Sequence, residues 1–262
     1  MKRTAFVAAG IGLALALAGC SSDDDGGSST AASSSNTWTT PAAPSIDMSR
    51  FAALPAVPAP TAPTVDCSYP AGGPAAKAVQ PPNATGVSDE GTVSVALTTN
   101  EGPIGLSLDR AAAPCTVNSF TSLTEQGYFD DTPCHRLSTT PGLQILQCGD
   151  PTGKGTGGPG YQFANEYPTT AYAANDPAAA EALVYPRGTI AMANAGPDTN
   201  GSQFFLVYAD SLLPPQYTAF GTISDEGLAT IEKIAGAGDD GSMSAGGGAP
   251  NTPVTIETAK VA

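Results

Sequence analysis

The sequence contains little charge, and most of it has one sign. Only 13% of the 262 residues are charged, and 24 acidic residues against 10 basic ones give a formal net charge of −14. Binding to nucleic acid or to anionic lipid head groups requires clustered Lys and Arg. Beyond Lys2 and Arg3 the chain has no basic run. We therefore expect no nucleic-acid partner.

Histidine occurs once, as His135, and no Gly-x-Ser-x-Gly string or Cys-x-x-Cys pair is present. The missing Gly-x-Ser-x-Gly string argues against a serine hydrolase, and the missing Cys-x-x-Cys pair argues against a zinc site. A Gly-x-Gly-x-x-Gly string over 153–158 is followed at once by Pro159, so no helix N-terminus is available there for a phosphate. We expect no metal and no other cofactor.

The apolar run near the N-terminus, residues 5–18, is also short. Its 14 residues are fewer than the roughly 20 that span a bilayer, and they suit the apolar region of a signal peptide. The run ends in Leu-Ala-Gly-Cys, which resembles the lipobox of bacterial lipoproteins. This resemblance implies a signal peptide over 1–19, acylation of Cys20, and a protein anchored to the membrane on its extracytoplasmic side. The alternative is an ordinary secretory signal with an incidental cysteine.

Residues 20–90 form a low-complexity stretch rich in Pro, Ala and Ser. Such a composition buries little surface and favours extended conformations, so we predict a disordered, semi-stiff tether. Cys67 and Tyr69 mark a point at which this tail could begin to dock on a domain.

Four further cysteines lie beyond the export signal, where disulfides can form. Four cysteines allow three pairings, and the sequence does not choose among them. We predict at least one disulfide, since two of the cysteines flank an expected hairpin. The four are Cys67, Cys115, Cys134 and Cys148.

Residues 91–262 show the periodicities of a folded domain. Apolar residues alternate over 92–108, which predicts a hairpin, and a helix is expected from Pro114 to a glycine cap at Gly127. A second helix is predicted over 225–235. Further strands are expected at 133–137, 144–148, 189–193, 203–208, 218–223 and 253–258, while residues 168–185 should form a surface excursion.

Three segments of this domain, in order, resemble the cyclophilin-type peptidyl-prolyl cis/trans isomerases. They are Cys-His-Arg-Leu with Gln-Cys-Gly-Asp, then Met-Ala-Asn-Ala-Gly-Pro-Asp-Thr-Asn-Gly-Ser-Gln-Phe-Phe, then Leu-Leu through Phe-Gly, and they lie at 134–150, 192–205 and 212–221. The resemblance spans about 92–258. It implies a mainly β fold, a closed eight-stranded antiparallel barrel capped by two helices, in a lipoprotein of actinobacterial type.

The chemistry of the resemblance agrees with these residue types. Rotation about a peptide bond has a barrier of about 18–20 kcal/mol, and a cation that hydrogen-bonds the prolyl nitrogen favours the twisted state. Arg136 matches the family's catalytic arginine. The resemblance further implies a substrate-binding surface formed by His135, Leu143, Ile145, Gln147, Ala193, Asn194, Gln203, Phe205, Leu213 and Tyr217.

Within that set, Phe205 would support the proline ring, and the backbone of Asn194 would receive substrate. We expect a structural or peripheral role for His135, because isomerisation needs no proton transfer. Substrates would be proline-containing segments of exported proteins, and the domain would act as a monomer.

The sequence departs from the family at the pocket wall. Leu143 or Gln144 stands in place of an aromatic residue, and Leu212 and Tyr217 stand where many members carry Trp and His. The alternative function is therefore a cyclophilin-like module that binds proline-containing segments without useful turnover.

Overall fold

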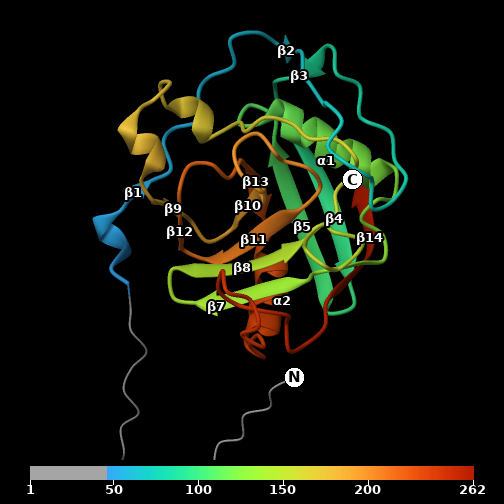
Figure 1. Ribbon diagram of the computed structural model, residues 1–262, viewed down its shortest axis with the longest axis vertical. Coiled ribbons are helices and arrows are strands. Elements are labelled where there is room, and N and C mark those ends of the chain that lie inside the picture. The colour runs from blue at the N-terminus through green and yellow to red at the C-terminus, as the bar shows by residue number, and fades with distance from the viewer. Residues whose placement is uncertain (1–45) are drawn as a thin grey trace, which may run out of the picture. The chain divides into compact units, whose positions relative to one another are not determined.

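The computed structural model describes residues 46–262 (Figure 1). The predicted signal peptide, Cys20 and the first part of the predicted tether lie outside these residues. The helices are α1 (Pro114–Glu125) and α2 (Asp225–Ala235), with 3-10 turns at Met48–Arg50, Thr169–Ala171 and Pro177–Ala180. The strands are β1 (Ala52–Ala53), β2 (Thr64–Val65), β3 (Val87–Ser88), β4 (Thr92–Thr99), β5 (Gly102–Asp109), β6 (Thr132–Pro133), β7 (Arg136–Thr140), β8 (Leu143–Cys148), β9 (Leu183–Tyr185), β10 (Thr189–Met192), β11 (Phe204–Ala209), β12 (Ser211–Leu213), β13 (Ala219–Ile223) and β14 (Thr255–Val261).

β4 and β5 form the predicted hairpin, in antiparallel register from the pair Thr92–Asp109 to the pair Thr99–Gly102. Every second residue of β4 is buried, and β5 follows the same alternation. Because successive side chains of a strand point to opposite faces, this pattern gives the hairpin one apolar face. That face forms one wall of the hydrophobic core.

The main sheet contains nine strands in the order β6-β14-β4-β5-β13-β10-β11-β8-β7, and all its pairings are antiparallel. The predicted mainly β, antiparallel fold is confirmed. The two end strands, β6 and β7, are separated in the chain only by Cys134 and His135. The sheet therefore curls back on itself through the covalent chain. The sheet has nine strands where eight were predicted, because the stretch 132–140 is interrupted at Cys134 and His135 and counts as two strands, β6 and β7.

The two predicted helices lie at opposite ends of the curled sheet, α1 towards the top of Figure 1 and α2 at the bottom. α1 has Pro114 in its first turn, where the missing N–H costs nothing. α2 begins after Ser224, whose hydroxyl accepts a hydrogen bond from the Gly227 N–H at 3.0 Å. Within residues 46–262 no helix is long and apolar enough to cross a membrane.

Four aromatic rings from separate parts of the chain form the centre of the core. The ring of Phe120 on α1 lies 4.8 Å from that of Phe129, 5.2 Å from that of Phe204 and 5.4 Å from that of Phe220. Burying one such ring stabilises a fold by about 1.5–3 kcal/mol. This cluster packs α1 against the strands that carry the candidate site.

All four cysteines within residues 46–262 form disulfides, which confirms the prediction of at least one. The pairs are Cys67–Cys115 and Cys134–Cys148. The second pair joins the residue after β6 to the end of β8, as the predicted hairpin suggested.

Residues 46–90 differ from the predicted spacer. β2 pairs with β3 within this stretch, and Cys67 is bonded to α1. The hydroxyl of Tyr69 donates to the Cys115 carbonyl at 2.8 Å. The composition of this stretch predicted a spacer that buries little surface. The bonds to α1 nevertheless hold part of it in a defined conformation.

The predicted surface excursion at 168–185 ends in β9, which belongs to a second, small sheet. β9 pairs with β12 in antiparallel and with β1 in parallel orientation. Tyr185 at the end of β9 is fully buried, and its hydroxyl donates to the Tyr217 carbonyl at 2.8 Å. The excursion thus holds one of the predicted site residues in place.

Candidate active site

The centre of the candidate site is a row of side chains across three neighbouring strands. Arg136 on β7 lies opposite Gln147 on β8, and Gln147 lies opposite Phe205 on β11. Residues paired in this way share one face of a sheet. Register therefore brings a cation, an amide and an aromatic ring together from positions up to 69 residues apart in the sequence.

Hydrogen bonds hold the Arg136 guanidinium in one orientation. Its Nη1 donates to Gln147 Oε1 at 3.2 Å, its Nε to the Gly246 carbonyl at 3.0 Å, and its Nη2 to the Ala245 carbonyl at 2.8 Å. Burial lowers the pKa of Arg136, but arginine keeps its charge in proteins. The site therefore presents a fixed positive charge.

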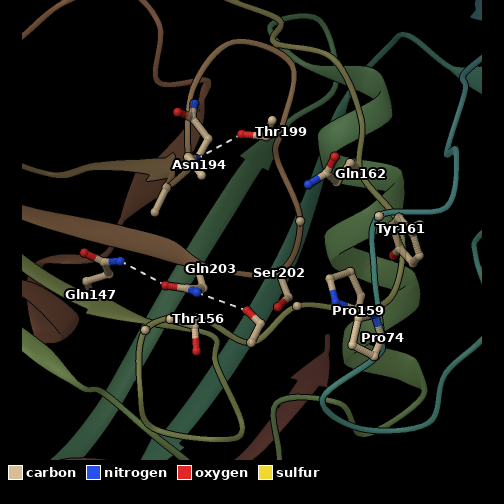
Figure 2. Close-up of a pocket in the computed structure, with 17 residues that line it drawn as sticks. Pro74, Gln147, Thr156, Pro159, Tyr161, Gln162, Asn194, Thr199, Ser202 and Gln203 are labelled. Atoms are coloured by element: carbon tan, nitrogen blue, oxygen red, sulfur yellow. Dashed lines mark hydrogen bonds between the residues drawn. The ribbon is translucent and has the colours of Figure 1, made fainter.

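The same polar network continues from Gln147 away from the arginine. Gln147 Nε2 donates to Gln203 Oε1 at 3.0 Å, and Gln203 Nε2 donates to the Gly157 carbonyl at 3.0 Å. Both amides are thus held in a single orientation. Figure 2 shows the link between the two glutamines.

The apolar part of the site includes Phe205. This side chain is buried and makes an edge contact with the Tyr217 ring, with centroids 5.8 Å apart. Ile145 is buried, while Leu143 and Leu213 are half-buried and pack against the core. These predicted residues therefore form the apolar part of the candidate site.

Ala193 and Asn194 directly follow β10 and border the site next to Gln203. The Ala193 N–H donates to the Gln203 carbonyl at 2.9 Å. The side chain of Asn194 donates to the Gln216 carbonyl at 2.8 Å and accepts from the Gly196 N–H at 3.2 Å. These bonds occupy the side chain of Asn194 and fix the loop that follows β10.

His135 directly precedes Arg136 and is covered by a neighbouring loop. Its side chain is buried, and neither ring nitrogen has a hydrogen-bond partner among the described residues. A Cβ added to Gly155 would lie 3.2 Å from its ring, so the 150–157 loop packs against it. Burial lowers the pKa of His135, an effect that Asp150 partly opposes. The structure thus places His135 beneath a loop.

A cavity of about 430 Å³ adjoins the row of site residues (Figure 2). It is lined by Gln147, Ala193, Asn194 and Gln203, together with residues of the 155–162 loop. Gln147 and Gln203 therefore belong both to the arginine network and to the cavity.

Sequence reasoning missed two groups of residues at this site. Ala245 and Gly246, which accept from Arg136, lie in a glycine-rich loop with no pattern that points to an arginine. Gly246 and Gly247 have φ of 92° and 74°, a region that favours glycine. Gly72 and Pro74, which line the cavity, lie in the predicted tether. The run of glycines at 246–248 was the one sequence feature that could have drawn attention to the loop that holds Arg136.

The fold, the fixed arginine and the apolar surface beside it indicate a cyclophilin-type isomerase, and comparison with known proteins agrees with this class. A family model described as cyclophilin type peptidyl-prolyl cis-trans isomerase matches residues 94–261. The chain belongs to this family.

The chain is similar to two mycobacterial proteins, each named probable peptidyl-prolyl cis-trans isomerase B. Identity is 58% over 200 residues with that of Mycobacterium leprae, covering 75% of this chain and 66% of the relative. It is 59% over 195 residues with that of Mycobacterium tuberculosis, covering 73% and 62%. The chain thus spans slightly less than two thirds of the length of these relatives. The shared region is longer than the family match.

The fold is also similar to the crystal structure of a cyclophilin type peptidyl-prolyl cis-trans isomerase of Cryptosporidium parvum. The two are 31% identical, with a TM-score of 0.52, over 66% of this chain and 98% of the other. A second structure of that protein, determined in the presence of the dipeptide Ala-Pro, matches with a TM-score of 0.51.

Proposed function

We propose that this protein catalyses cis/trans isomerisation of X-Pro peptide bonds. The observation that carries the proposal is the row Arg136, Gln147 and Phe205, which sets a fixed cation beside an apolar surface. A proline ring on Phe205 would lie next to the guanidinium. Membership of the cyclophilin family supports the same activity.

Arg136 would act on the prolyl nitrogen. In the twisted state this nitrogen loses its conjugation with the carbonyl and becomes a hydrogen-bond acceptor. A guanidinium has five N–H donors, and three of them are used within the described residues. The remaining donors would stabilise the twisted state more than either planar one, which is the condition for catalysis.

Replacing Arg136 tests this mechanism. In Arg136→Ala we expect kcat/KM on a short X-Pro peptide to fall by about 10²–10³-fold, the usual cost of removing a transition-state donor. Arg136→Lys should recover only a small part, since an ammonium cannot reproduce the planar fork. Turnover follows from a cis/trans exchange assay, and the thermal midpoint reports on folding.

Arg187→Ala provides the matched control, because Arg187 forms an exposed ion pair with Glu232 at 2.7 Å. Its activity should equal that of the parent. Near-parental turnover in Arg136→Ala would exclude the mechanism. A parent protein that binds the peptide but does not accelerate exchange would favour the alternative, a module that binds without turnover.

We also propose that the protein is exported and lipid-anchored, and that it assists the folding of exported proteins as a monomer. The lipobox-like end of the signal sequence supports the anchor. The two disulfides support export, because disulfides persist in oxidising compartments and are rare in the cytosol.

A further inference from the structure

The stretch from Cys67 to Gln80, here called the docked segment, runs antiparallel beside the loop 158–162, with an isolated β-bridge between Ala71 and Tyr161. The Gln162 N–H donates to the Pro70 carbonyl at 2.9 Å, and the Gly72 N–H donates to the Gly160 carbonyl at 3.0 Å. Farther along, the Ala76 N–H donates to the Gly158 carbonyl at 2.8 Å. Backbone bonds therefore fix the segment along the rim of the cavity.

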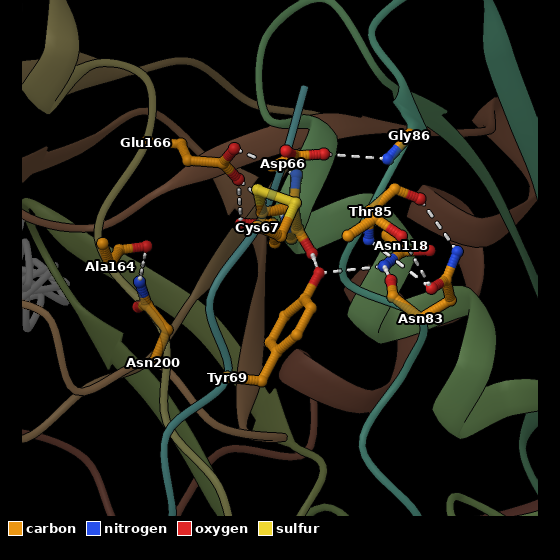
Figure 3. The surroundings of a disulfide bond; sticks show 12 residues. Asp66, Cys67, Tyr69, Asn83, Thr85, Gly86, Asn118, Ala164, Glu166 and Asn200 are labelled. Carbon is orange, nitrogen blue, oxygen red and sulfur yellow. Dashed lines mark hydrogen bonds between the residues drawn. A yellow bond between two sulfur atoms is a disulfide. The ribbon is translucent and has the colours of Figure 1, made fainter. Parts of the chain in front are cut away.

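Both ends of the docked segment are fastened to α1 or to the loop that follows it. The Cys67–Cys115 disulfide holds its start (Figure 3). Near its end, Lys77 Nζ donates to the Gly127 and Asp130 carbonyls at 2.8 and 2.9 Å. The Gln80 N–H donates to Gln126 Oε1 at 2.8 Å. A segment fixed at both ends forms a stationary wall.

Two residues of the docked segment border the cavity. Gly72 and Pro74 line the same cavity as Gln147 and Gln203. In Figure 2, Pro74 lies near Pro159 on the side of the cavity away from Gln147. The barrel residues therefore form only part of the cavity, and the docked segment completes it.

We propose that Gly72 and Pro74 are specificity-determining residues, which set the size of the cavity that receives a substrate side chain flanking the X-Pro bond. The proposal deepens the proposed function and rests on it. A peptide held at Arg136 can reach the cavity past Gln147 and Gln203, which border both. None of the residues that line the cavity is charged, so a charged side chain would lose hydration without gaining a partner. The cavity should favour small or medium neutral side chains.

The test uses X-Pro peptides that carry Ala, Leu, Phe, Lys or Glu at each position flanking the bond. Both kcat/KM and Kd are measured for every peptide. In the parent, we expect the neutral peptides to be preferred at one flanking position. Pro74→Ala widens the cavity and should raise the Phe-to-Ala ratio at that position about tenfold, the low end of the usual range for a small change of pocket size.

Gly158→Leu tests the cavity from the barrel side. Gly158 lines the cavity, and a Cβ added there would meet no atom within 4 Å. The variant should lower the Phe-to-Ala ratio about tenfold. Pro81→Ala is the matched control, since Pro81 is exposed and lies outside the lining; its ratios should equal the parent's.

An unchanged ratio in Pro74→Ala, with a shifted ratio in Gly158→Leu, would overturn the role of the docked segment. Failure of the proposed function is distinct, because it would appear as absent turnover for every peptide in the parent. In that case, the ratio of Kd values for the Phe and Ala peptides would still show whether Pro74 sets the size of the cavity.

Discussion

His135 is the one histidine of the chain, and its position next to Arg136 suggests a part in the chemistry. Its surroundings indicate a structural role. Within residues 46–262 neither buried ring nitrogen has a hydrogen-bond partner, and the charged groups of Asp150 and Arg136 act on the pKa of His135 in opposite directions. The carboxylate of Asp150 is itself occupied by N–H groups of Thr152, Thr156 and Gly157. It is therefore committed to holding the loop above the histidine.

Protonation of His135 should destabilise the fold. Its pKa in the folded state is lowered, with burial the largest cause, so the unfolded chain takes up the proton first as the pH falls below about 6.5. The stability that neutral His135 supplies is thus complete above that pH and decreases below it. We expect the free energy of unfolding to fall between pH 7 and pH 5 more in the parent than in His135→Phe.

Because the chain has one histidine, imidazole NMR signals report on it alone. Their titration midpoint should lie below 6.5. A midpoint at or above that value, or equal pH dependence of stability in parent and variant, would contradict this account.

At the scale of elements, the N-terminus of α1 is capped by a side chain that lies far away in the sequence. Its N-cap residue, Ala113, offers no side-chain hydrogen bond. The carboxylate of Glu166 instead accepts from the Cys115 N–H at 3.0 Å, the Thr116 N–H at 2.8 Å and the Thr116 hydroxyl at 2.6 Å. Figure 3 shows Glu166 beside the Cys67–Cys115 disulfide. A carboxylate at this helix end also complements the helix dipole.

Removing this cap should cost stability more than activity. Glu166→Ala leaves buried donors without an acceptor, and we expect it to lower the free energy of unfolding by about 2–3 kcal/mol. Denaturant unfolding measures the change. Glu181→Ala, at an exposed position, should lie within about 0.5 kcal/mol of the parent. Equal stability of the two variants would show that the bonds to Glu166 contribute little.

At the scale of the whole molecule, the Cys67–Cys115 disulfide joins the domain of the family match to the stretch before it. It closes a loop with a sequence separation of 48 residues, which by the loop-entropy model stabilises the fold by about 4 kcal/mol. The unit that folds therefore begins well before residue 94, where the family match starts.

The proposed lipid anchor predicts that replacing Cys20 changes the location of the protein in the cell. Cys20→Ala should yield protein in the soluble fraction without acyl label, because two or more acyl chains are needed for stable anchoring. Cell fractionation with lipid labelling measures this, and Cys20→Ala should retain parental isomerase activity. Membrane retention of the unlabelled variant would mean that another element tethers it.

Local signals determined much of the fold in advance. Alternation of apolar residues located β4 and β5, Pro114 located the start of α1, and the apolar spacing over 225–235 located α2. These elements could be predicted because their causes lie within a few residues of each other. The motif strings likewise identified Arg136, Gln147 and Phe205, although only strand register places them in one row.

Tertiary structure alone decided the rest. The Pro-rich stretch carries no local pattern, so the docking of residues 67–80 depends on hydrogen-bond partners more than 40 residues away. The same holds for the carbonyls of Ala245 and Gly246 that orient Arg136, and for the helix cap supplied by Glu166. Sequence periodicity reports which side of an element is buried. It does not report which distant backbone will meet that side, because long-range contacts form only when the chain closes its barrel.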